Sequence, residues 1–332
     1  MSALNCSMAE LRIWPSEFGL PSVDTACLQF MVATKLCAAP VSFVYDAHPW
    51  SSPSGMFPLF MEGSRMITSF EEYVEYLRSY KQDVVLDNEL VPSQICEFDA
   101  YNSYLKQKLL PALTYLLWLD DANFGTVTHY WYSSKLPFGY NSYYVMKRKR
   151  QAKAFIEACR KSPTQLTLDG IQVLNALSAK LGDNKYFCGD KPCSLDALIF
   201  GYLAPLLRLP LPTDRLQLHL TSCPNLVRFV ESLISIYLPL TDSAIQEQTA
   251  TKKFWAKRKA EAQKVIESKR IIKEQKRAER ERAKDMPIRD TILFAMGTLV
   301  CCVLFALHTG IIQISPAVQS KGIIKSKGIR RR

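Results

Sequence analysis

Cysteine pairs with the C-x-x-C spacing are missing from this sequence, although it contains ten cysteines. Histidine is also scarce, with four residues scattered over 332 positions. Cys188 and Cys193 form a close pair, but no second pair and no nearby histidine completes a set of four metal ligands. We therefore predict no metal site, and we interpret the cysteines as small buried apolar residues whose thiols stay reduced.

The first 20 residues lack an apolar run of signal-peptide length, and they contain Glu10, Arg12 and Glu17. This stretch is acidic rather than rich in arginine. A secretory signal and a mitochondrial matrix presequence are therefore both disfavoured.

Charged residues are missing from one long stretch near the end of the chain, between Asp290 and Lys321. Within it, the 24 residues from Thr291 to Ile314 are mostly apolar, and a helix needs about 20 residues to cross a bilayer core. A buried core helix is the alternative, which the length and the basic flanks disfavour. We predict a transmembrane helix over these residues. A short basic tail follows, with Lys321, Lys325, Lys327, Arg330, Arg331 and Arg332.

Positive charge is not in excess in most of the chain, although the net charge is +11. Residues 1–251 contain 21 Lys and Arg against 24 Asp and Glu, so all of the positive excess lies in residues 252–332. A mildly acidic body has no electrostatic reason to bind phosphate backbones, so we predict no nucleic-acid partner.

A single C-terminal span implies insertion after translation, which leaves the body in the cytosol. A short basic tail after such a span favours the mitochondrial outer membrane over the endoplasmic reticulum. We therefore expect a tail-anchored protein of that membrane whose body faces the cytosol.

Residues 1–80 show the order β-α-β-β-β-α that is typical of a thioredoxin-like domain. Short apolar runs predict the strands, and Ser22 is placed as the cap of the first helix. Ser69 to Glu72 reads as a capping box that opens the second helix. The predicted elements are strands at 11–15, 41–45, 56–61 and 65–67, and helices at 22–36 and from 69 onward.

The rest of the chain is predicted to be helical. Residues 81–92 form a linker, residues 93–240 an all-helical domain, and residues 241–290 a charged helical stalk. The span at 291–314 and the tail at 315–332 follow. We interpret the charged segment 252–289 as a solvated stalk, and the alternative is a surface helix held on anionic lipid headgroups.

Five sequence blocks over about residues 10–240 resemble the metaxin family, of the type-one or type-three branch that carries a C-terminal anchor. The blocks occur in order along the chain: Ile13-Trp14-Pro15 with Gly19 to Asp24, Pro49 to Gly55, Lys108 to Leu113 with Trp118 to Asp120, Pro137-Phe138, and Phe187 to Asp190 with Ser194 to Ala197 and Gly201 to Pro205. His48 replaces the asparagine that opens the second block in the family.

The resemblance implies a glutathione-transferase-like fold, with a thioredoxin-like N-terminal domain and a helical C-terminal domain. It also implies a subunit of the sorting and assembly machinery, which inserts β-barrel precursors into the mitochondrial outer membrane. The implied partners are a second metaxin of type two and the barrel-forming core subunit. The inner-membrane organising complex and motor adaptors for mitochondrial transport are further implied partners.

The glutathione-binding positions of the fold relatives are incomplete in this chain. Ser16 is the one hydroxyl that follows the first strand, and Glu17 beside it opposes a thiolate. Pro58 matches the loop proline that is cis in this fold. Thr68-Ser69 replaces the Glu/Gln-Ser pair that holds glutathione, so we interpret Ser69 as a helix cap.

Asp196 matches the capping motif of the helical domain, although Cys193 stands where Ser or Thr is usual. We predict a structural role for it and no catalytic residue or cofactor in this chain. The predicted function is a non-enzymatic subunit for import and insertion of β-barrel precursors. The alternative is a tail-anchored transferase of the glutathione type that acts on hydrophobic electrophiles.

Overall fold

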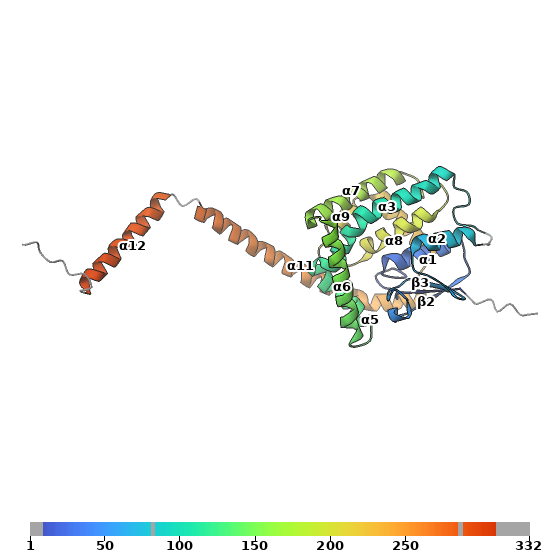
Figure 1. The fold of residues 1–332 in the computed structure, drawn as a ribbon, viewed down its shortest axis with the longest axis horizontal. Coiled ribbons are helices and arrows are strands. Elements are labelled where there is room, and N and C mark those ends of the chain that lie inside the picture. The colour runs from blue at the N-terminus through green and yellow to red at the C-terminus, as the bar shows by residue number, and fades with distance from the viewer. Residues whose placement is uncertain (1–8, 81–83, 285–287, 310–332) are drawn as a thin grey trace, which may run out of the picture. The chain divides into compact units, whose positions relative to one another are not determined.

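The computed structural model describes residues 9–80, 84–284 and 288–309, and the chain divides into two units, residues 1–267 and residues 268–332. In the first unit a small sheet with two helices is followed by a larger helical part (Figure 1). The two parts share one continuous hydrophobic core. The first unit is therefore one packed body, which positions the candidate site.

The sheet contains β1 (Ala9–Ile13), β2 (Val41–Tyr45), β3 (Leu59–Glu62) and β4 (Arg65–Ile67) in the order β2-β1-β3-β4. β1 is parallel to β2 and antiparallel to β3, and β3 is antiparallel to β4. Ala9, Leu11 and Ile13 are buried in alternation with half-buried residues, the period that a strand requires. All four predicted strands are present, but the first spans Ala9–Ile13 instead of residues 11–15, and the third begins at Leu59.

The two helices of this part are α1 (Thr25–Leu36) and α2 (Phe70–Ser79). The prediction of Ser22 as the cap of α1 is wrong, because the Asp24 carboxylate accepts hydrogen bonds from the N–H groups of Ala26 and Cys27 over 3.1 and 3.2 Å. α2 begins after Ser69 as predicted, but the capping box is wrong. The Ser69 hydroxyl donates to the Glu71 carboxylate over 2.8 Å and leaves the backbone of the helix uncapped by a side chain.

The helical part begins with α3 (Pro92–Thr114) and its continuation η2 (Tyr115–Leu119). A corner of short helices follows, and then the longer helices α6 to α8 and the pair α9 and α10. The bounds are α4 (Asp121–Asn123), η3 (Phe124–Thr128), α5 (His129–Lys135), α6 (Tyr140–Cys159), α7 (Pro163–Leu181), α8 (Ser194–Arg208), α9 (Arg215–Thr221) and α10 (Pro224–Tyr237). The short helix η1 (Pro49–Ser51) lies between β2 and β3.

α8 is the central helix of the body, since every residue from Ser194 to Leu206 is buried. A helix that is apolar on all sides must be surrounded by other elements. α8 contacts α1, α3, α9 and α10. The Gln29 side chain of α1 donates to the Leu198 carbonyl over 3.1 Å, and Gly201 lies directly against Gln29. This contact joins the sheet part to the helical part.

α11 (Asp242–Lys284) begins on the surface of the body and is not solvated there. Trp255 is buried and contacts the Phe18 ring at 4.9 Å. Arg258 donates to the Thr126 carbonyl over 3.1 Å. The interpretation of residues 252–289 as a solvated stalk is therefore wrong for its first two turns. Residues 268–281 of the second unit are exposed.

α12 (Ile288–His308) contains the predicted span as far as the structure describes it. Within it, residues Asp290–His308 are long and apolar enough to cross a membrane. The last residues of the prediction, 310–314, lie outside the described residues. The same is true of the basic tail with Lys321, Lys325, Lys327, Arg330, Arg331 and Arg332.

Candidate functional site

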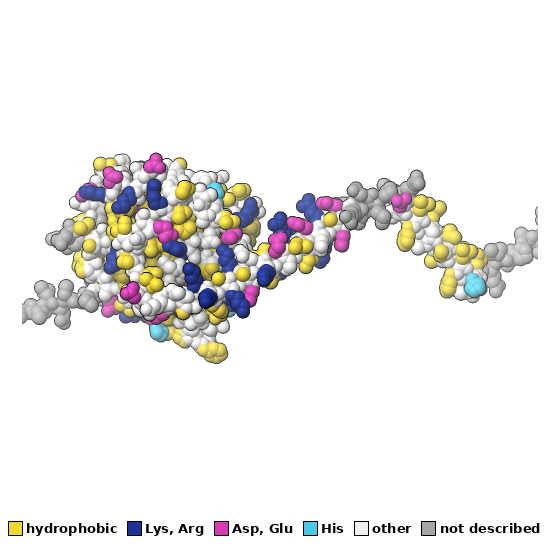
Figure 2. All heavy atoms as spheres, turned by 180° about the vertical axis from the view of Figure 1, so that it is seen from behind, with side chains coloured by type: hydrophobic (Ala, Val, Ile, Leu, Met, Phe, Trp, Pro, Cys, Tyr) yellow, Lys and Arg dark blue, Asp and Glu magenta, His cyan; other side chains and the backbone are white. Residues whose placement is uncertain are grey.

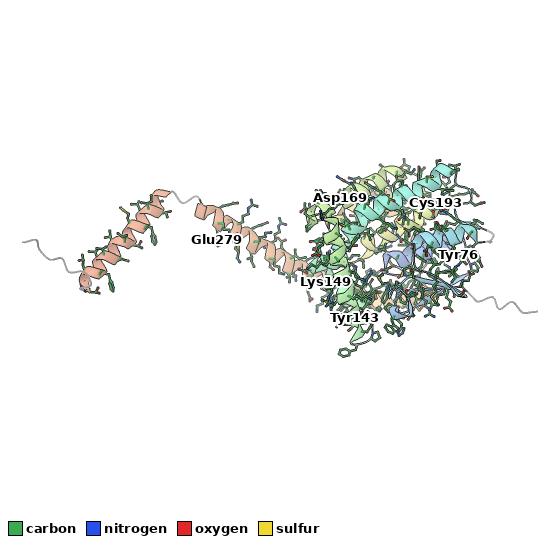
Figure 3. All side chains as sticks on the ribbon, viewed as in Figure 1. Tyr76, Tyr143, Lys149, Asp169, Cys193 and Glu279 are labelled. Carbon is green, nitrogen blue, oxygen red and sulfur yellow. The ribbon has the colours of Figure 1, made fainter. Side chains whose placement is uncertain are left out.

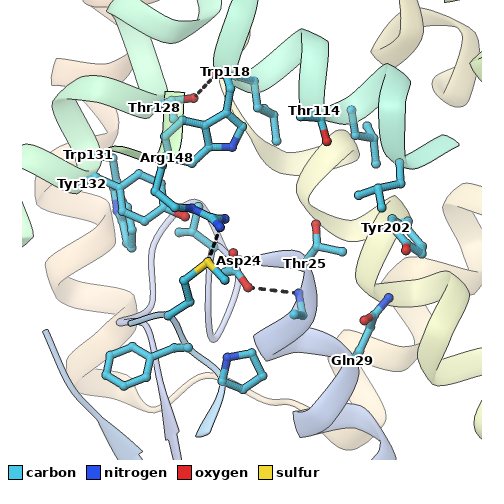
Figure 4. A pocket seen from close by; sticks show the side chains of 18 of the residues that line it. Asp24, Thr25, Gln29, Thr114, Trp118, Thr128, Trp131, Tyr132, Arg148 and Tyr202 are labelled. Atoms are coloured by element: carbon cyan, nitrogen blue, oxygen red, sulfur yellow. Dashed lines mark hydrogen bonds between the residues drawn. The ribbon is translucent and has the colours of Figure 1, made fainter. Parts of the chain in front are cut away.

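A cavity of about 400 Å³ lies between the start of α1, the loop before β3, and helices of the helical part (Figure 4). Its walls are mostly apolar, with several hydroxyl groups, one carboxylate (Asp24) and one guanidinium (Arg148). The lining residues are Val23, Asp24, Thr25, Ala26, Gln29, Ser54, Met56, Phe57, Pro58, Thr68, Leu110, Leu113, Thr114, Leu117, Trp118, Val127, Thr128, Trp131, Tyr132, Arg148, Tyr202 and Leu209.

The Asp24 carboxylate caps the N-terminus of α1. Two backbone N–H groups donate to it, as described above, so the positive end of the helix is already matched with a negative group. Burial raises the pKa of Asp24, while the charge of Arg148 and these hydrogen bonds act in the opposite direction. In this fold an anion or a thiolate at the cavity would compete with that carboxylate for the same helix end.

Arg148 brings the opposite charge into the cavity from α6. Its guanidinium lies 5.3 Å from the centre of the Trp118 ring and contacts the Met56 sulfur. Its Nε has no hydrogen-bond partner in the described part of the chain. The Arg148 guanidinium thus packs against an aromatic ring and a thioether, and it forms no salt bridge with another described residue.

The Cys27 thiol and the hydroxyls of Tyr132 and Tyr202 are held in their protonated forms. Burial, and next the charge of Asp24, raise the pKa of the Cys27 thiol well above its ordinary value. Burial likewise raises the pKa of the Tyr132 hydroxyl, with Asp24 as the second cause. Burial also raises the pKa of Tyr202 to about 12. At neutral pH these groups are poor nucleophiles, because the reactive form is the thiolate or phenolate.

Aromatic rings close the wall of the cavity beside β1. Trp14 is 1% exposed and meets Phe57, Trp131 and Tyr132 edge-on, with ring centres 5.1 to 5.9 Å apart. Such edge-to-face contacts add about 0.5–1.5 kcal/mol each beyond the apolar area that they bury. Trp14 follows β1 directly, so the chain places a packing residue where the first strand ends.

The structure brings two of the four sequence-predicted ligand positions to the cavity. Pro58 and Thr68 line it, and the Phe57–Pro58 peptide bond is cis, as the resemblance implies. Ser69 is not among the lining residues, and its hydroxyl donates to Glu71 instead.

Ser16 is also absent from the cavity wall, and the residues that follow it contact α11. Glu17 in that loop is 6% exposed, and its carboxylate accepts a hydrogen bond from Thr251 over 2.6 Å. Lys135 lies 3.7 Å from the same carboxylate. The only hydroxyl that the sequence offered as a nucleophile thus belongs to a loop that packs against a helix.

Sequence reasoning missed Asp24 and Arg148. Asp24 was signalled by its position just before a helix, where Asp is a preferred cap. Arg148 was hidden within the basic run of residues 147–150, in which no periodicity marks the one residue that turns inward.

Asp196 caps α8 from inside the helix. Its two carboxylate oxygens accept the N–H groups of Phe187 and Cys193, each over 2.8 Å, and the Cys193 thiol donates to it over 3.1 Å. Cys193 therefore takes the place that Ser or Thr usually holds, and the capping role of Asp196 is confirmed. Among the described residues, no group of His, Cys, Asp or Glu could hold a metal ion.

Two family models match the chain. One, described as outer mitochondrial membrane transport complex protein, matches residues 27–150, and one for the glutathione S-transferase C-terminal domain matches residues 170–233. A glutathione S-transferase from Ceriporiopsis subvermispora, solved in complex with glutathione, is similar in structure with a TM-score of 0.50. It is 14% identical, and the match covers 71% of this chain and 99% of that one.

Curated relatives match over more of the chain and at higher identity. The metaxin-1 homolog of Caenorhabditis briggsae is 48% identical over 92% of this chain and 97% of its own length. Metaxin-1 of Mus musculus is 34% identical over 69% of this chain and 75% of its own length.

The mixed sheet, the central helix and the cavity between them define a glutathione-transferase-like fold, as predicted. The chain belongs to the metaxin family, on the side of metaxin-1 and metaxin-3. The family is one of mitochondrial outer-membrane transport-complex proteins, and the single apolar helix α12 agrees with an anchor in that membrane.

Proposed function

We propose that this chain is a non-enzymatic subunit of the sorting and assembly machinery of the mitochondrial outer membrane. In this role it supports the import and insertion of β-barrel precursors. The family match to outer-membrane transport-complex proteins supports the proposal. The observation that carries its non-enzymatic part is the Asp24 carboxylate at the N-terminus of α1.

A glutathione transferase must stabilise a thiolate, and a helix N-terminus next to the cavity is suited to that task. In this chain Asp24 already accepts the free N–H groups there, and its negative charge repels a second anion. The Cys27 thiol and the Tyr132 hydroxyl stay protonated for the reasons given above. Thr68 offers no acid or amide for the amino group of a glutathione ligand. Each feature disfavours transfer chemistry.

We propose that a second metaxin and the barrel-forming core subunit are the partners. The free edge of β4 and the long helix α3 suit the metaxin contact. Met66 in β4 is 55% exposed, and β4 pairs with β3 on one side only among the described strands. An edge strand with a free side is a natural site for pairing with another chain.

We propose that α12 anchors the chain and that the body faces the cytosol. Confinement to one membrane raises the effective concentration of the body at its partners. This effect strengthens binding without any additional contact between the proteins. The proposed division is a thioredoxin-like domain at 1–80, a linker at 81–92, a helical domain at 93–240, a stalk at 241–290, a span at 291–314 and a tail at 315–332. Protease treatment of intact mitochondria tests the orientation, because an accessible body is degraded while the outer membrane is still closed.

The function is tested by recovering the tagged full-length chain from mitochondria in mild detergent and identifying bound proteins by mass spectrometry. The expected result is co-purification of the barrel-forming core subunit and a second metaxin. The matched control is a chain that ends at residue 290, which should recover less of the core subunit because it is not confined to the membrane.

Retention on immobilised glutathione is measured with the same preparation. Binding to the resin without recovery of either assembly subunit would favour the transferase alternative and make Ser16 the first residue to substitute. Recovery of both subunits without retention supports the assembly role.

A further inference from the structure

The corner between α5 and α6 exposes an unusual group of apolar side chains. Phe138 is fully exposed, and Tyr143, Trp50 and Met146 are 60%, 50% and 46% exposed. We call this group, together with Tyr140, the aromatic corner. In Figure 3, Tyr143 lies at the lower edge of the body, where α5 meets α6. Figure 2 shows hydrophobic side chains projecting from that edge in the opposite view.

The aromatic corner is one connected surface rather than scattered residues. The Trp50 and Tyr140 rings are 4.7 Å apart, and the Tyr140 and Tyr143 rings are 5.8 Å apart. Phe138 stands between Pro137 and Gly139, and Gly139 has a φ of 86°, a value that favours glycine. This turn holds the ring outward at the tip of the corner. The short helix η1 and helix α6, far apart in the sequence, both contribute to the surface.

Basic side chains outnumber acidic ones around the aromatic corner. Residues 122–156 contain six Lys and Arg and no Asp or Glu. Tyr143, Lys147 and Arg150 follow each other at helical spacing and share one face of α6. The Lys147 ammonium lies 5.9 Å from the centre of the Tyr143 ring. Asp46, which reaches the corner through His48, is itself paired with His48 and Arg12.

We propose that the aromatic corner binds a phospholipid bilayer surface that carries anionic headgroups. Tryptophan and tyrosine favour the interface between water and lipid, because each ring has an apolar body and a polar group. Phe138 would enter the apolar side of that interface. Lys147 and Arg150 would face the headgroups, where each basic residue strengthens binding by about fivefold.

Two observations favour a bilayer over a protein as the occupant. Lys147 and Arg150 are exposed on the same face of α6 as Tyr143, which matches a negatively charged surface such as that of anionic lipid. The chain also contains α12, an apolar helix long enough to cross a membrane, and the anchoring proposed above would keep the body next to a bilayer. Tethering lets a weak surface contact persist, because the second contact becomes intramolecular.

The test uses the native tryptophans of the full-length chain. Of the five, all in the described part of the chain, Trp50 is half exposed and the other four are at most 8% exposed. The chain is reconstituted into vesicles whose phosphatidylcholine carries brominated acyl chains, which quench tryptophan fluorescence on contact. We expect Trp50 to be quenched when the vesicles contain an anionic phospholipid, and W50F to lose this quenching.

Two further variants in the W50F background distinguish a specific contact from general proximity to the membrane. F138W places the probe at the tip of the corner and should be quenched severalfold more than L168W, its control. Leu168 on α7 is 54% exposed, comparable to Trp50, and lies outside the corner. The double variant K147E/R150E should abolish the dependence on anionic lipid while circular dichroism stays unchanged.

Equal quenching of F138W and L168W would overturn the proposal, because it would mean that the body meets the bilayer without a preferred face. Absence of quenching at both Trp50 and F138W would also overturn it, and would leave the aromatic corner to a protein partner.

Discussion

The side-chain oxygen of Gln248 accepts a hydrogen bond from the backbone N–H of Gly19 over 2.6 Å, which joins residues 229 positions apart. With the buried Trp255, this contact fixes the start of α11 on the loop that follows β1. The helix that leads toward the membrane anchor thus begins as part of the body.

Replacing Trp255 by Ala should release this start of α11. A large aromatic side chain truncated in a packed site loses about 3–5 kcal/mol of local stability. Hydrogen exchange measured by mass spectrometry should therefore speed up over residues 242–259, while α8 stays protected. Lys253→Ala is the control, since that side chain is exposed. Unchanged exchange in W255A would contradict the docking of α11.

Gly201→Ala should destabilise the body, although Ala is the better helix former by about 1 kcal/mol. A Cβ at this position would lie 2.3 Å from Cγ of Gln29 and 2.7 Å from the Thr25 carbonyl oxygen. Overpacking of this kind costs about 1–3 kcal/mol because backbone must move. Gly125→Ala is the control, because its Cβ would meet nothing within 4 Å. Thermal unfolding should show a lower Tm for G201A only.

Asp196 should make the body less stable as the pH rises through 6. Burial raises its pKa from the ordinary 3.8 to about 6. Between these values the folded chain keeps a proton that the unfolded chain releases, so the free energy of unfolding falls with rising pH. A shift of about two pKa units corresponds to about 3 kcal/mol.

Comparing the free energies of unfolding at pH 4 and pH 7 checks the role of Asp196. Asp196→Asn should lose this part of the pH dependence, and at pH 4 it should be less stable by about 1–2 kcal/mol as its cap weakens. The exposed Asp190→Asn should keep the pH dependence of the unaltered chain. The prediction fails if the pH dependence of D196N equals that of the unaltered chain.

Asp24 can be tested through the difference between two substitutions. Asn is as good a helix cap as Asp, whereas Ala removes the acceptor and costs about 0.5–2 kcal/mol. We therefore expect Asp24→Ala to lower the stability of the body and Asp24→Asn to lower it much less. Chemical unfolding monitored by tryptophan fluorescence measures both. Equal losses in the two variants would mean that the charge beside Arg148, rather than the cap, is what matters.

Deletion of residues 291–332 should leave a folded body that no longer resists extraction from membranes at high pH. The hydrophobic core lies entirely before residue 256, so the truncated chain keeps every packing contact described for it. An unfolded truncated chain, detected by circular dichroism, would show that the anchor contributes to folding.

Several elements could be predicted from the sequence because their causes are local. Strand alternation in β1, the glycine stop after α7 and the apolar run of α12 each depend on residues next to one another in the chain. The fold class followed from motif blocks in order, and Pro58 and Thr68, two of the positions compared with the glutathione site of the fold relatives, line the cavity. The N-terminal cap of α1 was harder to predict. Ser22 and Asp24 are equally good candidates until the backbone fixes which side chain reaches the free N–H groups.

The sequence by itself determined the element order, the body with little net charge and the candidate membrane span, since these depend on composition and periodicity. Only the tertiary structure decided that Arg148 turns into the cavity while Lys147 and Arg150 stay outside. The physical reason is the rotation of 100° per residue along α6, which sends neighbours in one basic run to different environments. The tertiary structure likewise decided that the loop after β1 contacts α11 through Glu17 and Gly19 and that Ser16 does not line the cavity, because these contacts join residues more than 200 positions apart.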